Sequence, residues 1–291
     1  MSMIDPQFDS LVPGRHPDRR TFLATTLGAG FALAVQPVMA QTAIQTPAQG
    51  LLAGEVEIPV RDGRMKAYRA APMRQGAPVV LVVSEIFGVH EHIRDVCRRL
   101  AHLGYVAIAP ELFARQGDPR TLEAVPEILS KITNRTPDAE VMADLDATVA
   151  WAKTQQADTA RLLITGFCWG GRITWLYAAY NPQVKAGVAW YGRLVGTVNA
   201  VTPRHPTDLA GELKAPVLGL YGGLDTGIPL ETVDAMEKAL KAGSAAAKAS
   251  QIHVYDNAPH AFHADYRPSY RKEEAEDGWK RMEAWFTQAL R

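Results

Sequence analysis

Cysteine is scarce in this sequence, and neither sign of charge is in excess. Only Cys97 and Cys168 are cysteines among 291 residues, too few for the disulfide framework that stabilises small secreted domains. Lysine plus arginine and aspartate plus glutamate both number 31, so the formal net charge is zero. A neutral chain implies no basic face, which argues against nucleic acid as a partner. Hydrophobic residues make up 47% of the chain, enough for a sizeable core in one large domain or two small ones.

The first 40 residues contain no apolar stretch that is long and hydrophobic enough for a stable membrane span. They place the pair Arg19-Arg20 before an uncharged stretch from Thr21 to Gln36, and Val38-Met39-Ala40 then offers a small-residue cleavage site. This order resembles a twin-arginine (Tat) export signal, whereas an amphipathic helix with a chance arginine pair is the alternative. We expect a bacterial protein that the Tat machinery exports in folded form, to the periplasm or otherwise out of the cytoplasm, with a mature chain that begins near Gln41.

The two cysteines are expected to remain separate thiols. Cys97 belongs to a helical repeat of apolar residues between Ile93 and Leu103, whose apolar face should pack on a sheet. Cys168 lies in a glycine-rich turn, and a disulfide would require the two Cα atoms to lie within about 7 Å. A free reactive thiol is unusual in the periplasm, and folding before export would help to protect it.

Apolar runs alternate with helical repeats along most of the chain. Val79 to Val83 form a continuous apolar run, typical of a strand buried on both faces, and Asp62-Gly63 is typical of a hairpin turn. The alternation predicts an α/β fold in one domain over residues 41–291, with a mostly parallel sheet, helices on both faces and an antiparallel N-terminal hairpin. The expected strands span 56–60, 65–71, 77–85, 105–109, 162–167, 184–191, 217–221 and 251–255. The expected helices span about 92–103, 138–154, 230–241 and 270–290, with another after Gly171; residues 193–211 are expected to form a loop over the active-site end, and residues 242–248 a surface connection.

A sharp glycine turn carries Cys168. The segment Gly166-Phe167-Cys168-Trp169-Gly170-Gly171 follows an apolar strand and precedes a helix. It resembles the nucleophile elbow of the α/β-hydrolases, with cysteine in place of the usual serine. Side chains at Gly166 and Gly170 would clash with the strained backbone of such a turn. The elbow predicts covalent acyl chemistry through a thiolate, whereas a buried structural cysteine is the alternative.

Two further candidates follow strands downstream. A cysteine nucleophile needs a base that forms the thiolate, and the base needs an acid that orients it. In this fold the chain order is nucleophile, acid, base. Asp225 follows the strand 217–221 and His260 follows the strand 251–255, so both fall at the edge where active sites of open α/β sheets gather. Taken singly, Asp225 could cap a helix or close a turn and His260 could be a surface or core residue, and His263 competes with His260 as the base.

The pairs His260/His263 and His90/His92 also have a spacing that metal ligands use. No third ligand cluster accompanies either pair, so we expect no metal site. Acyl transfer through a thiolate requires no cofactor, and none is expected.

Several separated segments resemble the dienelactone hydrolase family (carboxymethylenebutenolidases) over most of residues 55–290. The segments are Ser84-Glu85-Ile86-Phe87-Gly88, residues 110–116, Gly166–Gly171, Gly223-Leu224-Asp225 and His260-Ala261-Phe262. The resemblance implies an α/β-hydrolase fold and a hydrolase of small carboxylic esters or lactones.

The same resemblance implies the roles of particular residues. It implies a Cys168–His260–Asp225 triad and an oxyanion hole made by the backbone N–H groups of Ile86 and Trp169. It also implies that Glu85 contacts the thiol and helps to control its ionisation. A carboxylate at a buried strand end should have a perturbed pKa, although a helix cap is the alternative role for Glu85.

The sequence departs from the family's pattern at one place that concerns the substrate. The family holds the substrate's carboxylate with arginines, one of them shortly after the catalytic histidine, and Ala264 occupies the expected position here. Arg172, Arg267 and Arg271 lie near the motifs in sequence, and surface salt bridges are their expected role. We therefore expect an ester or lactone substrate other than dienelactone itself. A non-hydrolytic ligand-binding or thiol-redox protein on the same scaffold is the alternative.

Overall fold

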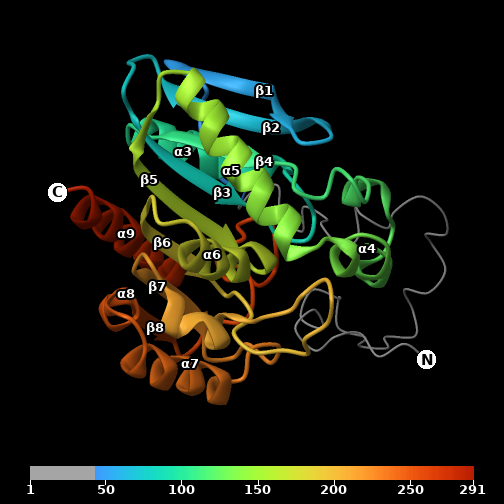
Figure 1. Ribbon diagram of the computed structural model, residues 1–291, viewed down its shortest axis with the longest axis vertical. Helices are drawn as coiled ribbons and strands as arrows, with labels where there is room; N and C mark the ends of the chain where they lie inside the picture. Colours follow the sequence, from blue (N-terminus) through green and yellow to red (C-terminus); the bar gives the residue numbers. More distant parts are fainter. Residues whose placement is uncertain (1–42) are drawn as a thin grey trace.

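The computed structural model describes residues 43–291, so the expected Tat signal over residues 1–40 lies outside the described residues. The strands form one sheet of eight, in the order β1-β2-β4-β3-β5-β6-β7-β8 (Figure 1). They are β1 Leu51–Val60, β2 Gly63–Pro72, β3 Pro78–Val83, β4 Val106–Pro110, β5 Asp158–Phe167, β6 Val184–Trp190, β7 Val217–Gly222 and β8 Gln251–Tyr255. The α-helices are α3 Glu91–His102, α4 Val125–Lys131, α5 Asp138–Thr154, α6 Trp169–Tyr180, α7 Leu230–Ala242, α8 Ala245–Ala249 and α9 Lys272–Ala289.

The predicted hairpin forms one edge of the sheet. β1 pairs antiparallel with β2, with Val60 opposite Gly63, and β2 pairs antiparallel with β4. The other strand pairs are parallel. The mostly parallel sheet with an antiparallel N-terminal hairpin is therefore confirmed, and no helix among residues 43–291 is long and apolar enough to cross a membrane.

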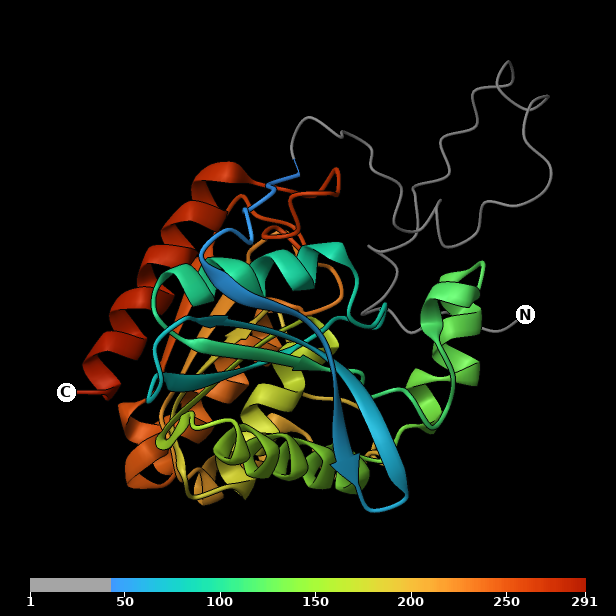
Figure 2. The same cartoon turned by 90° about the horizontal axis from the view of Figure 1, so that it is seen from above.

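Helices cover the sheet on both faces, as the alternating pattern predicts. Figure 2 shows α3 and α9 on one face, and α5, α6 and α7 on the other. Every residue of β3 in the middle of the sheet is buried, which explains the continuous apolar run from Val79 to Val83. The core therefore lies in two layers, one on each side of the parallel strands.

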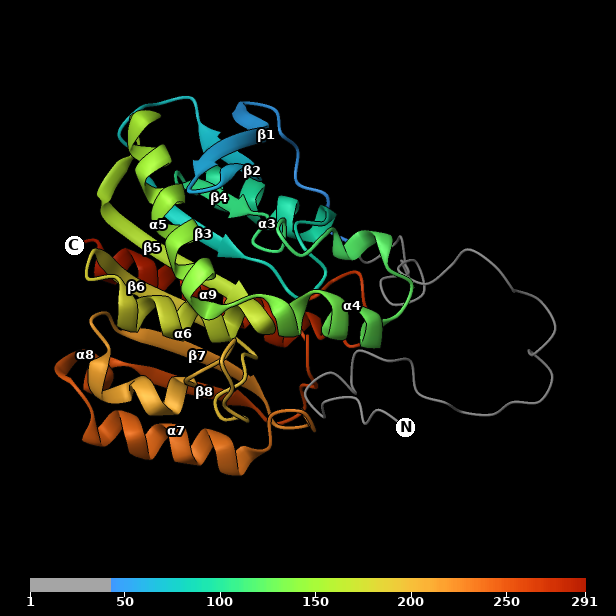
Figure 3. The same ribbon diagram turned by 45° about the vertical axis from the view of Figure 1, so that its right-hand side comes forward.

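The parallel strands place the chain's candidate residues at one end of the sheet, where the strands have their carboxyl ends. Figure 3 shows β3, β4 and β5 pointing toward the end of the molecule where α4 lies. Glu85 follows β3, Cys168 follows β5, Asp225 follows β7 and His260 follows β8. Because the carboxyl ends of parallel strands meet at the same edge, residues far apart in the chain come together there.

Several parts of the chain differ from the sequence prediction. α6 begins at Trp169 rather than after Gly171, because the elbow passes directly into the helix. The short helix α4 was not predicted, and α8 lies within the expected surface connection, where Ser244 caps it by accepting a hydrogen bond from the Ala247 amide. Helices of five and seven residues are too short to show a clear apolar period in sequence. Residues 193–205 are irregular as expected, but a 3-10 helix, η3, spans Pro206–Glu212.

Close backbone approach explains the two elbow glycines. A Cβ atom on Gly170 would lie 2.3 Å from the carbonyl oxygen of Val83 and 2.6 Å from that of Ser84. A Cβ atom on Gly166 would lie 2.2 Å from the carbonyl oxygen of Gly170. The predicted clashes at both glycines are confirmed, and the first turn of α6 packs directly on the end of β3.

Replacing Gly170 by alanine should destabilise the fold, because the contacted atoms belong to the backbone and cannot rotate away. Overpacking of this kind costs about 1–3 kcal/mol, which urea unfolding would measure as a lower midpoint. Gly211→Ala is the matched control, because a Cβ there meets no atom within 4 Å, and its unfolding free energy should stay within about 0.5 kcal/mol of wild type. A Gly170→Ala protein as stable as wild type would contradict the close contact.

Candidate active site

Cys168 occupies a strained turn between β5 and α6. Its backbone has φ 55° and ψ −115°, a left-handed conformation that costs a residue other than glycine about 1–3 kcal/mol. Its amide donates a hydrogen bond to the carbonyl oxygen of Trp190 at 3.0 Å, which ties the turn to the end of β6. Cys168 is buried, and both it and Cys97 on α3 are free thiols in the structure. Burial raises the pKa of the Cys97 thiol, which keeps that side chain unreactive.

Asp225 and His260 meet beside Cys168. Nδ1 of His260 lies 2.7 Å from Oδ2 of Asp225, and both side chains are almost completely buried. Ala261, the next residue, has φ 58°, so the chain turns sharply after the histidine. Burial lowers the pKa of His260, but the negative charges of Asp225 and of Cys168 raise it by a larger amount, so that the pKa is about 10. The imidazolium form is therefore favoured in the presence of the two negative partners.

The other ring nitrogen of His260, Nε2, is not used by Asp225. The charge of Cys168 in its thiolate form raises the pKa of His260, so the two side chains lie close together. Within the described chain, Nε2 of His260 is buried and has no partner at strict hydrogen-bond geometry. Such contacts are often long when no substrate is bound. Because Asp225 occupies Nδ1, Nε2 is the atom that can take the thiol proton.

Glu85 is completely buried behind the elbow. Its Oε2 accepts a hydrogen bond from the hydroxyl of Tyr266 at 2.6 Å and lies 3.4 Å from Nε2 of His90. Oε1 is buried and has no hydrogen-bond partner among residues 43–291, so no hydrogen bond joins it to Cys168. Burial raises the pKa of Glu85, but the hydrogen bond of His90 and the positive charges of Arg267 and of His90 in its protonated form lower it by a larger amount, to about 2. Glu85 does not cap α3, whose N-cap residue is His90.

The amides of Ile86 and Trp169 are available at the same place. Ile86 follows Glu85, and Trp169 opens α6, where an N–H group has no partner within the helix. Neither amide donates a hydrogen bond to another described residue, and both residues are buried. Because the first turn of α6 packs on the end of β3, the two loops lie side by side. The arrangement offers two unpaired donors next to Cys168.

Tyr191 is a site residue that motif reasoning missed. It follows β6 with φ 39°, and its ring lies 5.1 Å from that of His260 in an edge-to-face contact. Its hydroxyl is buried and has no hydrogen-bond partner in the described part of the chain. The position of Tyr191 at the carboxyl end of a predicted strand is the signal that could have identified it.

The histidines and arginines near the motifs have different places. His260, and not His263, contacts Asp225; the ring of His263 packs 4.5 Å from that of Trp190. The expected surface salt bridge of Arg172 is wrong, because its guanidinium is buried against both carboxylate oxygens of Asp138 at 2.7 Å. The Arg271 guanidinium donates to backbone carbonyl groups.

Arg267 lies at the site itself. Its guanidinium stands 5.3 Å over the ring of Phe87, and its charge lowers the pKa of Glu85. In the described residues, no three or more histidine, cysteine, aspartate or glutamate side chains are grouped so that they could hold a metal ion.

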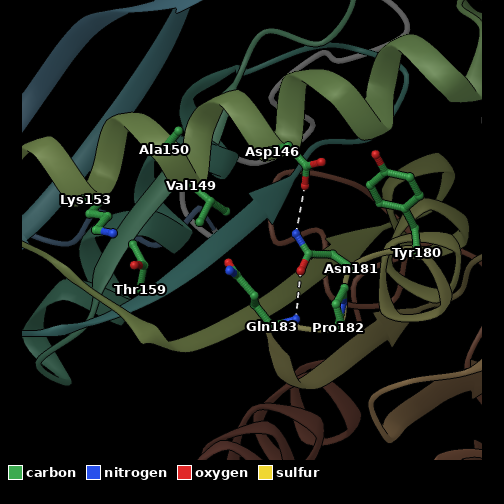
Figure 4. A pocket seen from close by; sticks show the side chains of 9 residues that line it. All are labelled: Asp146, Val149, Ala150, Lys153, Thr159, Tyr180, Asn181, Pro182 and Gln183. Carbon is green, nitrogen blue, oxygen red and sulfur yellow. Dashed lines mark hydrogen bonds between the residues drawn. The ribbon is translucent and has the colours of Figure 1, made fainter.

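A groove of about 610 Å³ lies at the opposite end of the parallel strands, near their amino ends (Figure 4). Its walls include Asp146 and Lys153 on α5, Thr159 at the start of β5 and Asn181 after α6. These positions lie at the amino ends of parallel strands, so the full length of β5 separates the groove from Cys168. A smaller cavity of about 270 Å³ lies at the same end of the parallel strands as Cys168, between residues 193–197 after β6 and 227–229 after β7.

Comparison with known proteins places the chain among hydrolases of one family. The sequence profile of the dienelactone hydrolase family matches residues 65–290. A protein of Methylorubrum extorquens with the provisional name carboxymethylenebutenolidase is 62% identical over 290 residues, which cover 99% of each chain. A protein of Escherichia coli K12 with the same provisional name is 54% identical over 268 residues, or 91% of this chain and 97% of that relative.

Solved structures have the same fold. The crystal structure of a protein from Klebsiella pneumoniae, provisionally named a dienelactone hydrolase, matches with a TM-score of 0.79 at 56% identity. That match covers 82% of this chain and 99% of the other. A dienelactone hydrolase-like promiscuous phosphotriesterase from metagenomic libraries matches with a TM-score of 0.67 at 22% identity, a likeness of fold alone. The expected α/β-hydrolase fold is confirmed.

Asp225→Asn tests whether Asp225 holds the pKa of His260 above its ordinary value. A pKa raised from 6.5 to about 10 on folding contributes stability that is complete below about pH 6.5 and is lost as the pH rises through about 10. The difference in unfolding free energy between wild type and Asp225→Asn should therefore be largest near pH 6 and should shrink toward pH 10. Urea unfolding at fixed pH values measures it. Asp277→Asn, which removes the exposed ion pair with Arg281, is the control and should show a difference that hardly changes over this range. A constant difference for Asp225→Asn would contradict the linkage.

Proposed function

Because the chain belongs to the dienelactone hydrolase family, we propose that it hydrolyses small carboxylic esters or lactones with Cys168 as its nucleophile. It is a carboxylic ester hydrolase of the carboxymethylenebutenolidase type. The observation that carries the cysteine mechanism is the buried contact of 2.7 Å between His260 and Asp225, beside a thiol on a strained elbow. A structural cysteine or a simple binding site would need neither His260 nor Asp225 beside Cys168.

The geometry supports a two-step acyl transfer. His260 takes the thiol proton on Nε2, and the sulfur of Cys168 attacks the carbonyl carbon while the carbonyl electron pair moves onto oxygen. The amides of Ile86 and Trp169 would stabilise that oxyanion. Collapse of the intermediate expels the alcohol oxygen, which takes the proton from His260 and leaves a thioester on Cys168. For a lactone, the alcohol remains attached to the acyl group.

Water completes the cycle. His260 accepts a proton from the water as it attacks the thioester, and the proton returns to the sulfur when the acid leaves. Asp225 accepts the Nδ1–H bond throughout, which fixes the tautomer and stabilises the imidazolium. No step requires a cofactor.

Glu85 is proposed to limit the thiolate before a substrate binds. The charges of Glu85 and of Cys168 both raise the pKa of Tyr191 and of Tyr266, so the two groups lie in one polar space. A carboxylate there disfavours a second negative charge on the sulfur. The imidazolium of His260 opposes this effect, so the thiolate fraction depends on both neighbours.

Export is a separate part of the proposal. Its support is the sequence alone: Arg19-Arg20, the uncharged stretch from Thr21 to Gln36, and the small-residue segment that ends at Ala40. The chemistry of Cys168 does not depend on it.

Replacing Arg19 and Arg20 together by lysine should abolish export, because the Tat signal is recognised by its arginine pair. Fractionation of a bacterial host that carries a Tat system should find the wild-type protein in the periplasm and the double variant in the cytoplasm. Arg15→Lys is the control and should leave export unchanged. An equal distribution of the wild-type and double-variant proteins would contradict the proposal.

Cys168→Ala should lower the turnover of p-nitrophenyl acetate by at least about a thousandfold, because the acyl group loses its covalent acceptor. Cys97→Ala removes the other thiol, buried on α3, and should keep turnover near wild type. Mass spectrometry of the rapidly quenched wild-type protein should find one acetyl group on the peptide that contains Cys168. Turnover near wild type in Cys168→Ala would refute the cysteine mechanism. Modification by disulfide reagents without acylation would favour the thiol-redox alternative.

A further inference from the structure

Two side chains from different loops hold the same oxygen atom of Glu85. Tyr266, in the segment after His260, donates its hydroxyl to Oε2 at 2.6 Å. His90, at the start of α3, places Nε2 3.4 Å from that oxygen. The Tyr266 hydroxyl and Nε2 of His90 lie 3.5 Å apart, and their rings meet edge to face with centroids 5.0 Å apart. Glu85, Tyr266 and His90 therefore form a closed and buried triangle.

The two oxygens of this carboxylate are treated differently. Oε2 lies within the triangle, whereas Oε1 is buried and has no hydrogen-bond partner in the described chain. Leaving a buried charged oxygen unpaired is costly, and a carboxylate with a purely structural role would be expected to use both oxygens. This difference between the two oxygens indicates that Oε1 is left open for a group that arrives during the reaction.

We propose that Tyr266 and His90 are positioning residues, which hold Oε2 of Glu85 and thereby reserve Oε1 for the reacting groups beside Cys168. The inference rests on the proposed role of Glu85 at that thiol. Neither Tyr266 nor His90 needs to touch the substrate, because both act through the placement of one carboxylate.

Tyr266 and His90, which together form what we call the clamp on Glu85, are both in the protonation state that is needed to hold Oε2. Burial and the charge of Glu85 raise the pKa of Tyr266, so its hydroxyl keeps the proton that it donates. Burial, together with the charges of His92 and Arg267, lowers the pKa of His90 although Glu85 raises it, so His90 is neutral near pH 7 and can donate through Nε2. A neutral histidine leaves the carboxylate its negative charge.

A second set of contacts fixes the loop that carries Tyr266. The preceding residue, Asp265, contacts Nδ1 of His92 at 3.0 Å and Nη2 of Arg99 at 2.6 Å. His92 and Arg99 both belong to α3, the helix that begins next to His90. The ring of His92 also packs 5.3 Å from that of Tyr266. The loop that carries Tyr266 is therefore anchored to the helix that begins next to His90.

The test is a double-mutant cycle between Tyr266→Phe and Glu85→Gln. Tyr266→Phe should lower kcat for p-nitrophenyl acetate about tenfold and change KM less than about twofold, a loss in the range of one hydrogen bond to a charged group. In the Glu85→Gln background the same change should alter kcat less than about twofold, because the charge that Tyr266 positions is no longer present. Thermal unfolding of each variant accompanies the kinetics.

Tyr177→Phe is the matched control. It removes a hydrogen bond of the same kind, from the Tyr177 hydroxyl to Oδ1 of Asp146 at 2.8 Å. Asp146 lines the groove at the amino ends of the parallel strands, away from Cys168 (Figure 4). Its kcat should equal that of the parent in both the wild-type and the Glu85→Gln backgrounds. Any general effect of losing a buried phenol–carboxylate bond is thereby separated from the clamp.

His90 provides an independent check by conservative replacement. His90→Gln keeps an N–H donor near the place of Nε2, whereas His90→Leu keeps the bulk and removes the donor. We expect kcat of the glutamine variant to stay within about threefold of wild type and kcat of the leucine variant to fall about tenfold. Equal losses in both variants would contradict a donor role.

The outcomes separate this inference from the proposed function. Equal losses on Tyr266→Phe with and without Glu85→Gln would show a structural role and overturn the clamp. Unaltered kinetics of Glu85→Gln itself would overturn the clamp together with the role of Glu85, while an inactive Cys168→Ala would still support the cysteine mechanism. An active Cys168→Ala would refute the proposed function directly.

Discussion

The close approach of the first turn of α6 to the end of β3 is the constraint on which the site depends. Gly170 has no room for a Cβ, because the carbonyl oxygens of Val83 and Ser84 would lie within 2.6 Å of it. This contact puts the amides of Ile86 and Trp169 beside one another and sets Glu85 behind the thiol. The parallel register of β5, β6, β7 and β8 then delivers Asp225 and His260 to the same edge. A wider gap between α6 and β3 would move both Cys168 and the Trp169 amide away from Ile86, because Cys168 is the N-cap residue of α6.

The second constraint is the cost of burying charge. An ion taken out of water loses several kcal/mol of solvation, so each buried carboxylate needs partners. Asp225 is paired with His260, Asp265 with His92 and Arg99, and Glu85 with Tyr266 and His90. Three buried polar atoms around Cys168 nevertheless have no partner in the described chain: Nε2 of His260, Oε1 of Glu85 and the hydroxyl of Tyr191. These three atoms outline the space in which the substrate would be bound.

The features that were predicted correctly from the sequence depend on the apolar period of a helix or strand, or on the position of a residue at the end of a strand. Both bounds of α5 were predicted, as were the hairpin and the positions of Asp225 and His260 after buried strands. These features are local, or follow from the rule that strand ends meet at one edge. The burial of Arg172 was missed because its partner Asp138 lies 34 residues away. The hydrogen bond between Tyr266 and Glu85 was missed for the same reason, since 181 residues separate the two. Contacts between loops exist only after the sheet has aligned them, and no periodic pattern records them.

Burial also bears on how a reactive thiol could persist outside the cytoplasm. Thiol–disulfide exchange requires a thiolate and access to it. Cys168 has no exposed surface, and Cys97 is equally buried and has a raised pKa. Large disulfide-bearing partners therefore meet neither thiol, whereas a small ester that enters the site meets a sulfur, a base and two amide donors together. Under the proposed cysteine mechanism, the same packing that brings Cys168 together with its partners would also limit its reaction with other thiols.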